Sequence, residues 1–170
     1  MPTDEGLVAQ VAAGDEAALR ELMRRWERRL AHFLDRHTGG RDVEDLYQDV
    51  WLRVVRAADE FDVDRRFSTW LFQIAVNRCR DWHRRRPPDP APALDAVAPI
   101  DGRSDAALDV ASLLAQISEA QREVVLLRYF QDLSEAEMAT LLEIPRGTVK
   151  SRLHHAMARL NELARDGDGR

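Results

Sequence analysis

The chain has 170 residues, 45% of them hydrophobic and 32% charged, which is ordinary for a globular protein and allows one domain or two small ones. Its net charge of −5 argues against a uniformly basic nucleic-acid binder, but residues 1–86 are neutral and the acidity lies beyond them. A single cysteine, Cys79, excludes an intrachain disulfide and fits a reducing compartment. With no signal-peptide pattern and no membrane-length apolar run, we expect a cytoplasmic protein without membrane insertion.

Helical periodicity runs along most of the chain, whereas the alternating runs that indicate strands are almost absent. The segment RRPPDPAPALDAVAPIDGRSD interrupts this pattern, and its proline and aspartate content is typical of a flexible linker. We therefore predict an all-α protein with two small helical domains, residues 1–86 and 110–170, joined by a linker over residues 87–109. The expected helices cover residues 5–13, 16–37, 43–58, 68–85, 110–115, 119–130, 135–142 and 146–164.

Four acidic side chains gather in the segment DVEDLYQDVWLRVV, around an apolar row at helical spacing. The acids are Asp42, Glu44, Asp45 and Asp49, and the apolar row is Val43, Leu46, Val50 and Val54. Acids at this spacing could bind a divalent metal, but the macrodipole also favours acids in the first turn of a helix. We interpret the cluster as a helix start and a protein contact rather than a metal or catalytic site.

The segment FSTWLFQIAVNRCRDWHRRRPP predicts a helix with two faces and an arginine-rich end. The inward face contains Leu71, Ile74, Ala75, Cys79 and Trp82. The outward face contains Gln73, Asn77, Arg80 and Arg84. Trp70 lies one step from this polar row, and two interpretations stay open for it. Its ring either stacks on single-stranded bases beside the arginines or packs in the core.

The C-terminal part predicts a helix-turn-helix. Ser118 with Gln121 and Ser134 with Glu137 match the capping box, and the short helix EAEMATLL precedes a tight turn near Gly147 and a long helix. In that last helix a core stripe contains Val149, Leu153, Ala156, Leu160 and Leu163. The opposite face carries Arg146, Lys150 and His154, flanked by Ser151, Arg152 and His155. Donors at the start of such a helix suit phosphates and major-groove base edges, so we predict DNA binding.

Enzyme chemistry is not indicated by any motif. The sequence contains no nucleophile–base pairing, no Gly-rich phosphate loop and no metal-ligand spacing. The His154–His155 pair points in two directions, because adjacent helical residues lie about 100° apart, and it has no cysteine or carboxylate partner at ligand spacing. We expect a non-enzymatic protein that needs neither a cofactor nor a metal.

Two long blocks carry a family resemblance. DVEDLYQDVWLRVVRAADEFDVDRRFSTWLFQIAVNRCRDWHRRR, a Pro-rich linker and then ISEAQREVVLLRYFQDLSEAEMATLLEIPRGTVKSRLHHAMARL together resemble the extracytoplasmic-function (ECF) sigma factors of bacteria. The resemblance runs from about Leu7 to Leu163. It implies an alternative sigma factor that binds core RNA polymerase and directs promoter recognition in response to a stress or envelope signal. Residues 1–86 would be sigma region two and residues 110–170 region four.

The resemblance also implies roles for individual residues. Those implied to bind the β′ clamp helices of polymerase are Asp45, Gln48 and Asp49. Those implied to bind the −10 element are Phe67, Trp70, Gln73, Asn77, Arg80 and Arg84. Those implied to bind the −35 element are Arg146, Thr148, Lys150, Ser151, Arg152, His154 and His155. His155 departs from the arginine that relatives often have, and the variable loop DVDRR leaves the promoter sequence open.

The partners implied by the resemblance are core RNA polymerase, through its β′ clamp helices and β flap, promoter DNA, and an anti-sigma factor. The alternative hypothesis is a stand-alone helix-turn-helix regulator, whose N-terminal domain senses a ligand or dimerises. Such a regulator would bind duplex DNA without polymerase, so complex formation with core polymerase distinguishes the two hypotheses.

Overall fold

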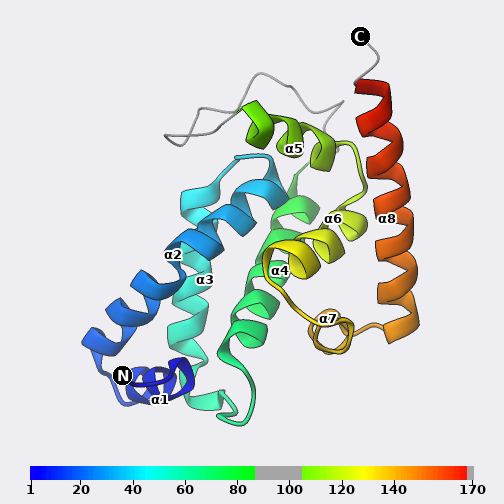
Figure 1. Ribbon diagram of the computed structural model, residues 1–170. Coiled ribbons are helices and arrows are strands. Elements are labelled where there is room, and N and C mark those ends of the chain that lie inside the picture. Colours follow the sequence, from blue (N-terminus) through cyan, green and yellow to red (C-terminus); the bar gives the residue numbers. More distant parts are fainter. Residues whose placement is uncertain (87–104, 168–170) are drawn as a thin grey trace. The chain divides into compact units, whose positions relative to one another are not determined.

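The structure is a computed structural model that describes residues 1–86 and 105–167 (Figure 1). Over these residues the chain contains helices and no strand, which confirms the predicted all-α class. Two compact units are present: Met1–Leu34 with Asp42–Arg85, and Asp35–Arg41 with Arg86–Arg170. Most of the predicted linker lies outside the described residues, and helix α5 begins at Asp105, inside the segment assigned to the linker.

The first unit is built from α1 (Asp4–Ala12), most of α2 (Glu16–Thr38), α3 (Val43–Arg56), the short 3-10 helix η1 (Ala58–Glu60) and α4 (Phe67–Arg85). Helix α3 packs along α4, and α1 packs on η1. The core is aromatic, because Trp26 meets Phe67 and Phe72 edge to face, with ring centroids 5.7 and 6.1 Å apart. Phe33 also packs on Phe72, at 5.2 Å. Burial of these rings fixes α2 against α4.

Trp82 does not belong to this core, so the prediction that it faces inward is wrong. The core side of α4 ends at the buried Cys79, one turn earlier. Trp82 is half-buried, and its indole N–H donates to Oδ2 of Asp42 at 2.8 Å. Asp42 itself adopts a left-handed backbone, with φ of 52°, and makes no side-chain cap on α3.

The second unit contains α5 (Asp105–Ala115), α6 (Glu119–Val125), the π-helical turn η2 (Leu126–Phe130), α7 (Glu135–Leu142) and α8 (Arg146–Gly167). Helices α6 and α7 both pack against α8. Both predicted capping boxes are confirmed: Ser118 and Ser134 each accept from the backbone three residues on, and Gln121 and Glu137 return the bond. These reciprocal bonds satisfy amides that the first turn of a helix leaves without partners.

The helix expected over residues 119–130 widens into a π-helix in its last five residues. Leu126 and Leu127 are buried there, whereas Tyr129 and Phe130 are exposed. The segment then reverses at Asp132, which has a φ of 56°, and the Leu133 amide donates to the Leu127 carbonyl at 3.1 Å. Sequence periodicity does not distinguish a π-helical turn from an α-helix over so short a length.

Arg122 joins α6 to the end of α5 through its largely buried guanidinium. It donates to the Leu114 carbonyl at 2.8 Å and to the Ile117 carbonyl at 3.3 Å. These carbonyls lie at and beyond the C-terminal turn of α5, where intrahelical donors run out. Burial lowers the pKa of Arg122 from its ordinary value.

Candidate nucleic-acid interface

The polar row predicted on α4 lies at the surface of the first unit. Asn77 and Arg84 are exposed, and Gln73 and Arg80 are half-buried. Asp81 lies beside the row and forms ion pairs with both Arg78, at 2.6 Å, and Arg84. The arginine-rich end of α4 is therefore less positive than its arginine count indicates, because one carboxylate offsets part of the charge.

Phe67 and Trp70 occupy different environments although both were predicted at the −10 site. Phe67 is completely buried, so its ring offers no surface to a base and leaves the set of candidate DNA contacts. Trp70 is half-buried, with its ring centroid 4.8 Å from that of Phe61 and 6.1 Å from that of Phe67. The Trp70 ring thus packs on aromatic neighbours while the residue stays partly accessible, a position that fits both interpretations that the sequence left open.

The segment between η1 and α4 is an ordered turn that reaches onto α4. Within it, the Asp62 carboxylate accepts from the Asp64 amide and the Asp62 carbonyl accepts from the Arg65 amide, both at 3.0 Å. The Arg65 guanidinium donates to Oε1 of Gln73 at 3.3 Å. Val63 at the tip is 59% exposed. The variable loop and the polar row of α4 therefore form one continuous surface.

Helix α3 carries a second exposed face in the same unit. Asp45, Gln48 and Asp49 are all exposed there. Leu52 and Val55 continue this face one turn on, and they are 52% and 43% exposed. Sequence reasoning missed these two residues, although the signal was present, since both fall outside the apolar row of α3. Exposed apolar side chains among polar ones are a feature of protein–protein contacts.

The first turns of α8 present donors at the surface of the second unit. Arg146, Lys150, Ser151, His154 and His155 are exposed, whereas Thr148 and Arg152 are half-buried. A hollow of about 360 Å³ is lined by Gly147, Lys150, Ser151, His154 and His155. Arg146 also reaches the Glu135 carboxylate of α7 at 3.4 Å. The opposite side of the helix is buried at Val149, Leu153 and Ala156, as the apolar stripe predicts.

The predicted turn between α7 and α8 is present, just before Gly147, at residues 143–145. Glu143 carries the left-handed backbone, with a φ of 56°, and the Ile144 amide closes α7 on the Ala139 carbonyl at 3.1 Å. Gly147 itself lies in α8, as its second residue. Apart from its chain neighbours and the nearby backbone of its own helix, no atom lies within 4 Å of a Cβ placed on Gly147, which keeps this side of α8 open.

Within the described ranges, no helix is long and apolar enough to cross a membrane. The same residues contain no group of three or more His, Cys, Asp or Glu side chains placed to hold a metal ion. In the acidic cluster at the start of α3, Asp42 accepts the Trp82 indole N–H.

The two helical units each match a family model, and both models belong to the sigma-70 class of transcription initiation factors. Residues 22–87 match the family model for Sigma-70 region 2, and residues 107–160 match that for Sigma-70, region 4. The α4 surface lies in the first match and the exposed start of α8 in the second.

Similarity to known proteins narrows this class. The ECF RNA polymerase sigma factor SigM of Mycobacterium tuberculosis H37Rv is 37% identical over 166 residues, covering 95% of this chain and 84% of that protein. The ECF RNA polymerase sigma-E factor of Escherichia coli K12 is 31% identical, covering 91% and 90%. The solved structure of CnrH in complex with the cytosolic domain of CnrY matches with a TM-score of 0.75 and 33% identity, covering 98% and 99%.

The chain belongs to the ECF family of RNA polymerase sigma factors. It is an alternative sigma factor that directs transcription from promoters, and the hypothesis of a stand-alone helix-turn-helix regulator is not favoured.

Proposed function

We propose that this sigma factor uses three separate surfaces. The exposed face of α3 binds core polymerase, α4 with the preceding loop binds the −10 strand, and the start of α8 binds the −35 duplex. The observation that carries the proposal is that the implied residues on these helices, Phe67 excepted, are exposed or half-buried, opposite a buried apolar row. A surface that packing leaves polar and accessible is available for a partner.

The α3 face suits a protein partner better than DNA. Asp45 and Asp49 are negative and would repel phosphates, while Leu52 and Val55 supply apolar area that a protein surface can cover. Gln48 lies between these two groups and offers both a donor and an acceptor. These properties support docking on the β′ clamp helices of polymerase.

The α4 surface suits a single strand with unstacked bases. Gln73 and Asn77 present amide groups that can pair with base edges, and Arg80 presents a cation for the backbone. The accessible part of Trp70 offers a ring on which a base can stack. Val63 and the turn around it extend the surface, so this turn contributes to the choice of −10 sequence.

The start of α8 suits duplex DNA. Lys150 and His154 follow Arg146 at steps of four, so the three lie on one exposed face of the helix. Ser151 adds a hydroxyl beside them, and Gly147 leaves room for close approach. A recognition helix presents its N-terminal residues to the major groove, and this set supplies the donors needed there.

A regulatory protein is a further proposed partner. CnrH, which is 33% identical to this chain, was solved in complex with the cytosolic domain of CnrY, and this supports a second protein partner. The family resemblance supports an anti-sigma factor as that partner and the cytoplasm as the protein's location. We further infer that the protein has no catalytic activity of its own and that the β flap contacts region four.

Run-off transcription with core polymerase on a genomic promoter library tests the function and finds the promoter at once. Gel filtration with core polymerase at low salt should give a stable complex, and failure to form one would refute the proposal. Asn77→Ala should impair open-complex formation while leaving polymerase binding unchanged. If polymerase binding falls equally, the Asn77 side chain is structural and the assignment of α4 is wrong.

A further inference from the structure

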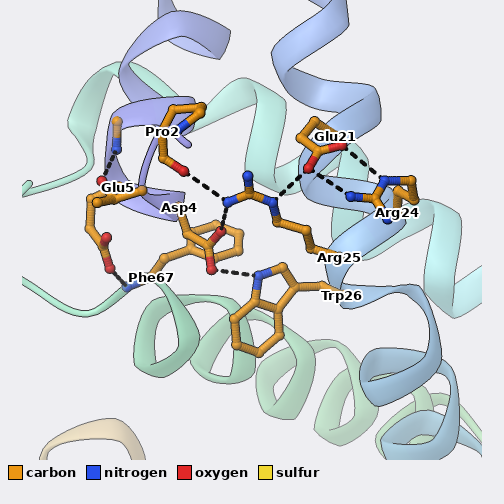
Figure 2. Close-up of polar contacts among 10 residues, drawn as sticks. Pro2, Asp4, Glu5, Glu21, Arg24, Arg25, Trp26 and Phe67 are labelled. Atoms are coloured by element: carbon orange, nitrogen blue, oxygen red, sulfur yellow. Dashed lines mark hydrogen bonds and ion pairs between the residues drawn. The ribbon is translucent and has the colours of Figure 1, made fainter.

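Two consecutive carboxylates in the first turn of α1 point to different helices (Figure 2). Asp4 turns to α2, where Oδ1 pairs with the Arg25 guanidinium at 2.8 Å and Oδ2 accepts the Trp26 indole N–H at 2.9 Å. Glu5 turns to α4, where Oε1 accepts the backbone N–H of Phe67 at 3.0 Å. This single turn therefore bridges α2 and the start of α4.

The Arg25 side of the bridge is held by further bonds. Its guanidinium donates to the Pro2 carbonyl at 3.0 Å and pairs with Glu21 at 2.8 Å. Glu21 in turn binds Arg24 at 2.8 Å. The hydrogen bonds that Arg25 donates to Asp4 and Glu21 raise the pKa of Arg25 above its ordinary value, which favours its charged form. Helix α1 is thus fixed to α2 at the point from which Glu5 reaches α4.

The bond from the Phe67 amide to Glu5 supplies an acceptor and a negative charge at the start of α4, where the helix has no acidic residue of its own. The first amides of a helix have no intrahelical acceptor, and negative charge near them is stabilising. Phe67 is the first residue of α4, and the first turn contains no acidic residue. Glu5, half-buried and 62 residues away in the sequence, provides both the acceptor and the charge. The position at which α4 begins therefore depends on α1.

The start of α4 in turn positions the aromatic part of the candidate −10 surface. The Phe67 ring packs on Phe61, at 6.3 Å, and on Trp70, at 6.1 Å. Phe61 precedes the variable turn and Trp70 borders the polar row, and their own rings are 4.8 Å apart. A shift of Phe67 would move both ends of the surface that binds the strand.

We propose that Glu5 is a positioning residue for binding of the −10 strand: through the Phe67 amide it fixes the start of α4, and with it Trp70 and the preceding turn. This inference rests on the proposed function of the α4 surface. Glu5 itself does not touch the DNA. Asp4 serves the same end indirectly, because it anchors α1 on Arg25 and Trp26.

Full-length Glu5→Ala and Glu5→Gln variants test this proposal, with Asp15→Ala as a matched control. The Asp15 carboxylate also caps a helix in the first unit, accepting from the Ala17 and Ala18 amides of α2 at 2.8 and 3.2 Å, but this bond is not to α4. Each variant is assembled with core polymerase. The probe is a labelled single-stranded 20-mer that the wild-type holoenzyme has enriched from a random pool, and its affinity is measured by fluorescence anisotropy.

We expect Glu5→Ala to weaken probe binding about fivefold, the factor that corresponds to loss of a helix cap. Glu5→Gln should stay within about twofold of wild type, because an amide oxygen caps a helix nearly as well as a carboxylate. Asp15→Ala should leave probe binding unchanged, and all three should bind core polymerase like the wild type.

If Glu5→Ala and Asp15→Ala weaken probe binding equally, the cause is a general loss of stability and the proposal is overturned. Unchanged probe binding by Glu5→Ala would also overturn it. If Glu5→Ala does not assemble with core polymerase, the test depends on Glu5→Gln, and a loss of more than tenfold in its probe affinity would overturn the proposal. If the wild-type holoenzyme enriches no oligonucleotide, the proposed function of α4 fails first, and that result is distinct from the others.

Discussion

Replacing Lys150 with alanine removes one exposed cation from the proposed −35 surface at little cost to the fold. Lys150 is the only lysine of the chain, and it lines the hollow at the start of α8. Within the described part of the chain, Lys150 makes no hydrogen bond or ion pair. The adjacent Val149, not Lys150, is buried in the core of the second unit. Substitution of an exposed residue without such contacts changes stability by less than about 0.5 kcal/mol. An altered DNA affinity therefore reports on the interface.

The expected effect is a change in the salt dependence of binding. Each neutralised phosphate adds about 0.9 to the slope of log K against log salt, because a condensed counterion is released. If Lys150 binds one phosphate, the variant should lose about 0.9 from the wild-type slope. Between 50 and 200 mM salt this difference makes the wild-type affinity fall about 3.5-fold more than that of the variant. Fluorescence anisotropy with a labelled duplex that carries the −35 element measures both slopes.

Arg159→Ala is the matched control on the same helix. It removes the same charge, but Arg159 lies beyond the hollow and pairs with Glu162 at 3.3 Å. Its slope should equal that of the wild type. An unchanged slope for Lys150→Ala would remove this residue from the phosphate contacts. An equal loss for both variants would show that net charge alone is responsible.

Three further outcomes are expected. Arg122→Met should speed hydrogen exchange of the backbone amides in α5 and α6 by more than tenfold, because loss of the hydrogen bonds to the Leu114 and Ile117 carbonyls costs about 2 kcal/mol. Mass spectrometry measures the exchange, and unchanged rates would show that Arg122 does not hold α5 to α6. Hydrogen bonds from Arg24 and Arg25 lower the pKa of Glu21 from 4.5 to about 2, so its stabilising charge is complete above pH 4.5 and lost as the pH falls towards 2. The Tm difference between wild type and Glu21→Gln should shrink over that window, and a constant difference would refute the linkage. Leu52→Ala should weaken binding to core polymerase about tenfold with unchanged Tm, as for an apolar anchor, and a fall in Tm would make Leu52 structural.

The parts of the fold that the sequence predicts well depend on information within one or two helical turns. The capping boxes at Ser118 and Ser134 each involve residues three apart, and both helices begin where predicted. The apolar stripe of α8 is equally local, and Val149 is buried as its spacing requires. Helix start signals and periodicity require no knowledge of the partner helix, so the elements and the all-α class were accessible.

The errors concern contacts between residues far apart in the sequence. Trp82 continues the inward face of α4 on a helical wheel, but its indole N–H bonds to Asp42, which is 40 residues away. Phe67 was implied by the resemblance to bind the −10 element, yet it is completely buried. A helical wheel gives the direction in which a side chain points but not how far the neighbouring helices extend to cover it. For the same reason the sequence did not predict the bond from the Phe67 amide to Glu5.

Two long-range hydrogen bonds hold α4, which has one buried face and one face proposed to bind the −10 strand. Helix α4 is tied near both ends by carboxylates from elsewhere in its unit, Glu5 at the Phe67 amide and Asp42 at the Trp82 indole. Between these ties lies the row that contains Gln73 and Asn77, on a helix whose other face is buried. A binding surface held in place before the ligand arrives loses less conformational entropy on binding. Under the proposed function of α4, we therefore expect Glu5 and Asp42 to favour recognition of the −10 strand without contacting it.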